Sequence, residues 1–180
     1  MSGYSQDFRL GIKAGGNLST LGTENAVIEK QTRTGYHIGL SASFDLAAFG
    51  LQPELLYSTQ GAEVSLPNLR YEEQYDYLSI PVTLKFSIGK GFNVHFGPYF
   101  AILMKATQRE TSGTDETVNN IDEYISNTDY GFFGGFGYDL NESFNFEARY
   151  NYGMKDVDSF GNNERRNRVF QISMTYFFIK

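Results

Sequence analysis

Few residues in this sequence could perform acid–base or nucleophilic chemistry. His37 and His95 could each act as a general base for Ser41 or Ser79 if a carboxylate lay beside them. The sequence contains no Gly-x-Ser-x-Gly, no His-Glu-x-x-His and no closely spaced group of histidines. We therefore interpret both histidines as structural residues and expect a protein that is not an enzyme.

A second candidate for chemistry is an acidic turn that begins like a calcium-binding loop. Asp156, Asp158 and Gly161 occupy the first, third and sixth positions of such a loop. Phe160 stands at the fifth position, and Asn167 stands at the twelfth, where a bidentate glutamate is required. The chain also has no cysteine, which excludes thiolate metal sites. We therefore expect neither a metal nor another cofactor.

The elements that must position these residues are strands, because apolar and polar residues alternate along most of the chain. The 13 Tyr, 16 Phe and 19 Gly among 180 residues favour the same structure, and no stretch has a persuasive helical period. The alternation predicts eight strands, over residues 8–18, 35–46, 50–60, 76–88, 92–106, 129–139, 144–155 and 167–179.

The connections between these strands alternate in length. Short turns are predicted at residues 47–49, 89–91 and 140–143. Long loops are predicted at residues 19–34, 61–75, 107–128 and 156–166. In an up-and-down meander this alternation places all long loops at one end of the sheet and the short turns, with both termini, at the other.

The size of the side chains decides which face of the sheet lies outside. In the segment 129–139, Gly131, Gly135 and Gly137 alternate with Phe132 and Phe136. The interior of an eight-stranded barrel is only just wide enough for side chains, so the bulky face must point outward, where its aromatic residues can form interfacial girdles. We predict an all-β, eight-stranded, antiparallel up-and-down transmembrane β-barrel. The alternative is a soluble ligand-binding barrel with its apolar face inside.

On this interpretation residues 8–180 form a single barrel domain. Residues 1–7 lack an apolar signal segment and are interpreted as an N-terminal remnant at the periplasmic end.

The inward face of such a barrel holds charged side chains, and buried charges must pair. We expect Arg149 to pair with Glu54 or Glu147. Because eight strands leave little free interior, this network is predicted to fill the lumen as a plug rather than to line a channel. Its predicted members are Arg9, Lys13, Gln52, Glu54, Lys85, Glu147 and Arg149.

The long loops hold most of the remaining acidic residues. These residues could bind a protein partner, could bridge divalent cations to lipopolysaccharide, or could simply be solvated. The net charge of -6 argues against a nucleic-acid partner. The candidate loop residues are Glu110, Asp115, Glu116, Asp122, Glu123, Asp156 and Asp158.

Five segments together resemble the outer-membrane β-barrel domain family of Bacteroidetes that is often described as PorT-like. They are GIKAGGNLS (11–19), LQPELLYSTQGAE (51–63), YDYLSIPVTLKF (75–86), FNVHFGPYFAILM (92–104) and ISMTYFF (172–178). The resemblance implies an eight-stranded barrel that is integral to a bacterial outer membrane and surrounded by its lipids. The named member of the family is linked to protein secretion and gliding motility.

We therefore expect a small outer-membrane barrel that acts as a structural or binding protein, presents surface loops and has a plugged lumen. One alternative is an accessory component of a secretion or motility apparatus. Another is a lipid-modifying enzyme or a small-solute channel. The sequence leaves the oligomeric state open.

Overall fold

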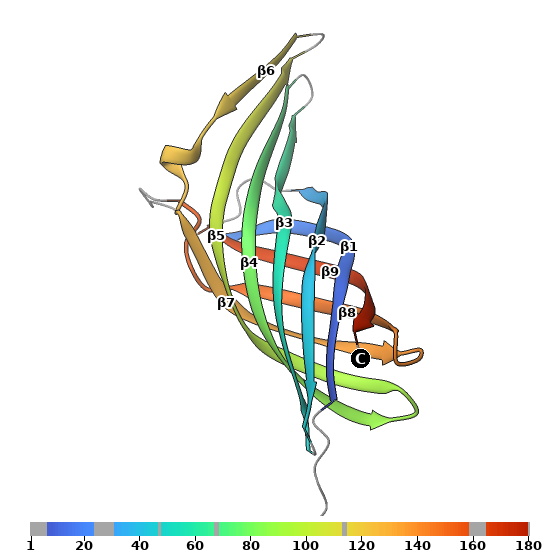
Figure 1. Cartoon of the computed structure of the whole chain (residues 1–180). Coiled ribbons are helices and arrows are strands. Elements are labelled where there is room, and N and C mark those ends of the chain that lie inside the picture. The colour runs from blue at the N-terminus through green and yellow to red at the C-terminus, as the bar shows by residue number, and fades with distance from the viewer. Residues whose placement is uncertain are drawn as a thin grey trace, which may run out of the picture.

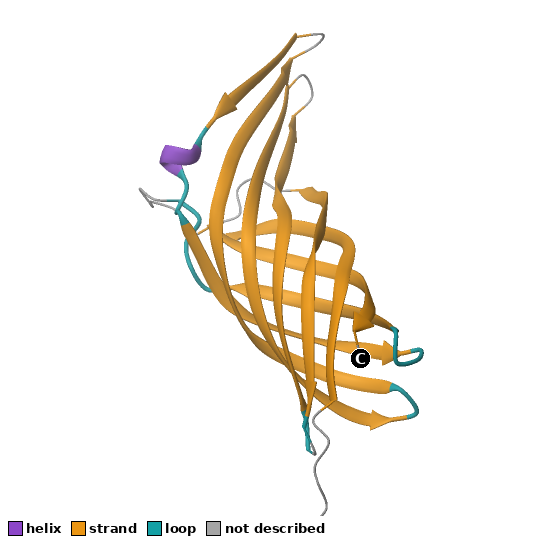
Figure 2. Cartoon of the chain, in the orientation of Figure 1, coloured by secondary structure: helices purple, strands orange, loops and turns teal. Residues whose placement is uncertain are grey.

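The computed structural model describes residues 7–23, 31–46, 48–66, 69–112, 115–158 and 165–179, which are almost entirely strand (Figure 1, Figure 2). The strands are β1 (Asp7–Thr23), β2 (Gln31–Asp45), β3 (Gly50–Leu66), β4 (Leu69–Gly89), β5 (Phe92–Ser112), β6 (Asp115–Asn120), β7 (Thr128–Asp139), β8 (Phe144–Gly153) and β9 (Arg165–Ile179). A short 3-10 helix, η1 (Asp122–Tyr124), follows β6. Within these ranges no helix is long and apolar enough to cross a membrane.

Eight of the strands close into a ring. Hydrogen-bonded neighbours follow the order β4-β3-β2-β1-β9-β8-β7-β5-β6, and every pair is antiparallel. A further pairing of β4 with β5 closes the ring and leaves β6 outside it. The first and last strands, β1 and β9, lie side by side from Leu10↔Ile179 to Thr23↔Arg165. The predicted eight-stranded antiparallel barrel is therefore confirmed.

The apolar face of the sheet lies on the outside of this ring. In β9, alternate residues from Asn167 to Phe177 are buried, whereas Phe170 and Ile172 between them are exposed. In β7, Phe132 and Phe136 are 58% and 67% exposed. An outward apolar face suits hydrocarbon and would be unfavourable in water. The alternative of a soluble barrel with an apolar interior is therefore wrong.

Glycine is required where strands approach closely and where the chain reverses. A Cβ atom on Gly97 would lie 1.9 Å from the carbonyl oxygen of Val82, so no side chain fits there. In the turn between β4 and β5, Gly89 and Gly91 have φ angles of 101° and 82°. Only glycine adopts this backbone region without strain, and the two residues therefore allow the tight reversal.

Three strands continue well beyond the ring, as Figure 1 shows. Residues 61–75, predicted as a loop, instead extend β3 and β4, which stay paired from Gly61↔Gln74 to Leu66↔Leu69. Residues 107–128, also predicted as a loop, extend β5 and contain β6 and η1. We call these extensions the protruding sheet, which consists of residues 61–66, 69–75, 106–112 and 115–120.

These two loop predictions were wrong because hydrophobic alternation weakens where strands leave the membrane. Backbone hydrogen bonds can hold a ladder without an apolar face. Ion pairs between neighbouring strands accompany this ladder. Arg70 Nη2 lies 2.6 Å from Glu63 Oε2, and Arg109 Nε lies 3.1 Å from Glu116 Oε1.

The other two predicted loops are shorter than expected. Within 19–34, β1 reaches Thr23 and β2 begins at Gln31, and within 156–166, β9 begins at Arg165. β8 ends at Gly153, not at Lys155. Residues 24–30 and 159–164 lie outside the described residues, as does the predicted N-terminal remnant apart from Asp7, the first residue of β1.

Candidate functional site

The middle of the lumen contains a network of buried ion pairs. Lys13 Nζ lies 2.8 Å from Glu54 Oε1 and also pairs with Glu147, while Arg149 Nη2 lies 3.0 Å from Glu54 Oε2. Gln52 donates to Glu54 Oε1 at 2.8 Å. The four charged side chains are at most 1% exposed. The structure therefore brings together five of the seven residues predicted for the lumen, and Arg149 pairs with Glu54.

Small residues on neighbouring strands make room for this network, which we call the central network. Lys13 lies in register with Gly39 on β2, and Glu147 lies in register with Gly137 on β7. Inward positions alternate between long charged side chains and glycine, so the large groups interleave across a narrow interior.

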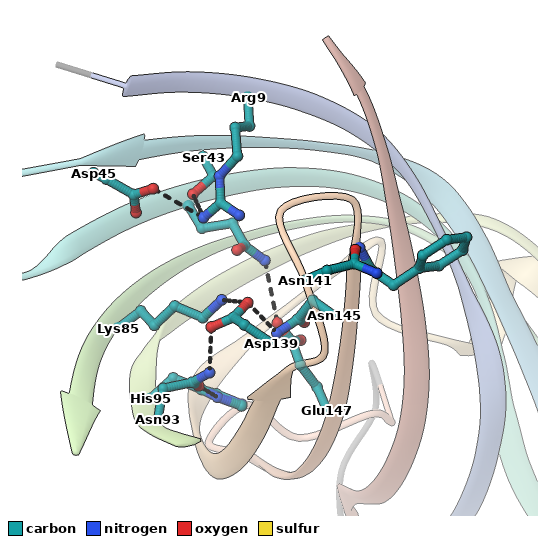
Figure 3. A network of polar contacts seen from close by, with 12 residues as sticks. Arg9, Ser43, Asp45, Lys85, Asn93, His95, Asp139, Asn141, Asn145 and Glu147 are labelled. Carbon is teal, nitrogen blue, oxygen red and sulfur yellow. Dashed lines mark hydrogen bonds and ion pairs between the residues drawn. The ribbon is translucent and has the colours of Figure 1, made fainter. Parts of the chain in front are cut away.

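The two other predicted lumen residues lie nearer the short turns and belong to separate ion pairs. Arg9 Nη2 lies 2.9 Å from Asp45 Oδ2, and Lys85 Nζ lies 3.1 Å from Asp139 Oδ1. Figure 3 shows both pairs, with Asn93 donating to Asp139. These residues line a cavity of about 770 Å³ that is open at this end of the barrel. We call this cavity the vestibule. It is polar and lies between the central network and the short turns.

Hydrogen bonds extend the central network toward the other end of the lumen. Arg149 Nε donates to Gln171 Oε1 at 2.9 Å, and Gln171 Nε2 donates to Asn17 Oδ1 at 2.8 Å. The ring of His37 lies 2.7 Å from Asn17 Oδ1 and 2.8 Å from Ser173 Oγ. Sequence reasoning missed Asn17 and Gln171, although both occupy inward positions of predicted strands.

The polar contacts of the two histidines do not include Ser41 or Ser79, the serines considered for a hydrolase. His37 contacts Asn17 and Ser173, and His95 Nδ1 lies 3.3 Å from Asn93 Oδ1. The polar contacts of these rings are with amide and hydroxyl groups of the lumen, which supports their interpretation as structural residues.

An apolar cluster fills the lumen at the end that bears the protruding sheet. Two segments outside the strands contribute to it: Ile125 after η1 and Val157 after β8. A bridge between Ile125 and Asp158 joins these segments, and Ser126 N donates to the carbonyl oxygen of Val157 at 2.8 Å. We call this group the mouth cluster, which comprises Leu21, Ala62, Tyr75, Tyr77, Tyr99, Ala101, Ala106, Ile125, Phe133 and Val157.

Arg165 connects the segment after β8, which contributes Val157 to the mouth cluster, to β4 in the wall of the barrel. It forms ion pairs with Glu73 on β4 and with Asp158, whose Oδ1 lies 3.1 Å from Arg165 Nη1. Burial alone would lower the pKa of Arg165, but neighbouring Tyr75, Glu73 and Asp158 raise it above its ordinary value. Arg165 therefore stays charged. We call its ion pairs with Glu73 and Asp158 the Arg165 clamp.

The candidate binding residues of the loops are not gathered at one place. Asp156 accepts hydrogen bonds from the backbone N–H groups of Asp158 and Arg165. Asp156 and Asp158 therefore both hold Arg165 in place. The other candidates are distributed along the protruding sheet and η1: Glu110, Asp115, Glu116, Asp122 and Glu123. Among the described residues no group of three or more His, Asp or Glu side chains is placed to hold a metal ion.

The closed ring, the outward apolar face and the polar lumen define a class of protein, the transmembrane β-barrel. Residues 4–159 match the family model described as the outer membrane protein beta-barrel domain, and the chain belongs to that family. No curated protein gives a significant match to the sequence.

Solved structures with the same fold include three outer-membrane barrels. Ail, the attachment invasion locus protein of Yersinia pestis, is 13% identical, with a TM-score of 0.56 over 96% of this chain and 99% of Ail. Neisserial surface protein A is 11% identical, with a TM-score of 0.56 over 95% and 97%. The N-terminal β-barrel domain of Pseudomonas aeruginosa OprF is 13% identical, with a TM-score of 0.52 over 96% and 98%. These likenesses concern the fold.

The family and the fold together locate the protein. It is an integral protein of the bacterial outer membrane, surrounded by lipid. In such barrels the short turns face the periplasm and the longer connections face outward, so we expect the protruding sheet and the mouth cluster at the extracellular end.

Proposed function

We propose that the protein is a structural and binding protein in which a plugged barrel anchors the protruding sheet above the cell surface. The order of that sheet is the observation that carries the proposal. The extensions of β3, β4 and β5 remain hydrogen-bonded through Leu66↔Leu69 and Ser112↔Asp115. A paired sheet presents its side chains in fixed positions, which lowers the entropy lost when a partner binds.

The side chains of the protruding sheet, and of the adjoining end of β2, suit a protein partner. Arg33 Nε lies 2.8 Å from Glu72 Oε1, and the hydroxyl of Tyr71 lies 3.4 Å from Glu110 Oε1, so charged groups there are held in place. Apolar surface accompanies them, because Val118 on β6 is 55% exposed and sits above the lipid-facing band. A mixture of apolar and fixed polar groups is typical of protein interfaces.

The closed lumen supports an anchor rather than a channel or an enzyme. The central network crosses the middle of the lumen, and the mouth cluster fills its extracellular end. The name of Ail attributes attachment to a barrel of the same fold, which supports a binding role by analogy of fold alone.

Single-cysteine variants test the proposal, because the chain has no cysteine of its own. In intact cells, a membrane-impermeant maleimide should label Val118→Cys on β6, and Ala48→Cys in the β2–β3 turn only after the outer membrane is permeabilised. A photo-crosslinker attached at position 118 should then give a discrete protein adduct. Absence of labelling at position 118 in intact cells, or absence of any adduct there, would contradict the proposal.

A second proposal follows from the resemblance to PorT-like barrels, which links the chain to a secretion or motility apparatus. The open vestibule at the periplasmic end favours it, because a periplasmic component could dock there on Arg9, Lys85 and Asp139. The same crosslinker at position 48 separates the two proposals. An adduct at position 48 but not at position 118 would favour the apparatus over the surface-binding role.

A further inference from the structure

One arginine lies on the lipid-facing side of the barrel at the level where the apolar band ends. In β9, Phe170 and Ile172 point outward within that band, and Arg168 is the next outward residue toward the extracellular end. Its register partners are Tyr152 on β8 and Thr20 on β1. The guanidinium therefore lies on the outer surface at the boundary between hydrocarbon and headgroups.

Neutral groups hold this guanidinium in place. Arg168 Nη1 donates to the carbonyl oxygens of Gly153 and Asn167 at 2.8 and 2.9 Å. Its Cζ atom lies 3.6 Å from the centre of the Tyr152 ring. Carbonyl dipoles and a ring face orient a guanidinium and favour its positive charge, but they do not neutralise it.

This arrangement differs from that of six other arginines. No carboxylate among the described residues forms an ion pair with Arg168. In a chain with a net charge of -6, an arginine held only by neutral groups is an exception. Each of the following has a carboxylate partner: Arg9, Arg33, Arg70, Arg109, Arg149 and Arg165.

The surroundings of Arg168 are also positive. Lys155, which follows β8, donates to Thr128 Oγ1 at the extracellular end of β7. The outward positions described on β1, β7, β8 and β9 carry no aspartate or glutamate. This side of the extracellular rim therefore carries a cationic patch, which we define as Lys155 and Arg168.

We propose that the cationic patch binds the phosphate group of an outer-leaflet lipid, the phosphorylated glycolipid lipid A. A guanidinium matches phosphate with two parallel hydrogen bonds, and Tyr152 supplies the aromatic group expected at a membrane interface. The surface directly below is apolar, with Leu18 46% exposed and Phe170 39% exposed. A ligand that meets a cation at the rim and an apolar wall beneath it must carry an anionic headgroup above acyl chains.

Native mass spectrometry of the full chain in detergent tests this proposal. The protein is mixed with equal amounts of diphosphoryl lipid A and the same lipid with its phosphates removed, and the retained adducts are compared. We expect about a tenfold preference for the phosphorylated lipid, the effect of one charge-assisted hydrogen-bond pair. Inorganic phosphate at millimolar concentration should not displace it, because free phosphate has no acyl chains.

Variants identify the residue responsible. Arg168→Gln should abolish the preference, Arg168→Lys should retain part of it, and Tyr152→Leu should weaken it while leaving the charge. Arg109→Gln is the matched control, because Arg109 is paired with Glu116 in the protruding sheet and should not alter the preference. Gel mobility before and after boiling confirms folding of each variant.

Three results would overturn the proposal. They are equal retention of both lipids by the wild type, an unchanged preference in folded Arg168→Gln, and displacement of the lipid by inorganic phosphate. If Arg168→Gln does not fold, an unchanged preference in Tyr152→Leu and Arg168→Lys together would overturn it as well.

Discussion

Lys13, Glu54, Glu147 and Arg149 carry two positive and two negative charges, so the central network is neutral as a whole. All four side chains are shielded from solvent. Removing one charge leaves an uncompensated charge in a region where water cannot reach it. Such a charge is far more costly than the loss of the pair.

This neutrality predicts strong coupling between Arg149 and Glu54. Arg149→Met leaves one excess negative charge, and Glu54→Gln leaves one excess positive charge. The double variant keeps the neutral pair of Lys13 and Glu147. We therefore expect the double variant to lose less stability than the sum of the single variants, by about 1 to 3 kcal/mol.

Urea-induced unfolding in lipid vesicles measures the free energy of each variant in this cycle. Additive losses would show that the two side chains are not coupled and that the contact at 3.0 Å contributes nothing to stability.

At the residue scale, the sequence predicts which side chains point inward but not how they pair. Strand alternation placed Lys13, Glu54, Glu147 and Arg149 on the inner face. It could not decide between Glu54 and Glu147 as the partner of Arg149. β3 and β8 are not adjacent in the sheet, so their contact across the lumen depends on the stagger of the whole ring.

At the scale of elements, the outer part of the protruding sheet, beyond Ala62 and Glu73, is connected to the barrel by strands that continue out of it and by the ion pair of Glu72 with Arg33 on β2. Its ion pairs involve partly exposed groups, for example Arg70 with Glu63 and Arg109 with Glu116. Exposed pairs of this kind contribute about 0 to 1 kcal/mol each. The sheet should therefore be dispensable for the stability of the ring.

A shortened hairpin tests this independence. Ala62 and Glu73 are register partners, so residues 63–72 can be replaced by Asn-Gly, which forms a two-residue turn. We expect the variant to fold and to keep its heat-dependent gel mobility, because Glu73 and its ion pair with Arg165 remain. The binding adduct at position 118 should weaken. Loss of the folded band would instead make the sheet part of the scaffold.

The ring strands could be predicted from the sequence because each one alternates between lipid and lumen. The extensions could not, because their two faces both meet water and hydrophobic alternation is absent there. The mouth cluster was missed for a related reason. Ile125 and Val157 are isolated apolar residues in polar segments, and only the closed ring brings them against Tyr75 and Tyr99.

At the scale of the whole molecule, two groups of buried side chains lie in series along the lumen, and we propose that both act as barriers. The central network closes the middle with charged side chains, and the mouth cluster closes the extracellular end with apolar ones. The vestibule of about 770 Å³ lies on the side of these barriers that carries the short turns. The outer face meets lipid, and the protruding sheet meets the surroundings of the cell.

Single-channel recording in planar bilayers tests this description most directly. The purified wild-type protein should insert without a stable ohmic conductance, because neither barrier leaves a continuous path for water. A variant that replaces Lys13, Glu54, Glu147 and Arg149 by alanine serves as the comparison and should conduct more than the wild type. A reproducible open pore in the unmodified protein would contradict the plugged barrel, and with it the proposal that the barrel serves as an anchor.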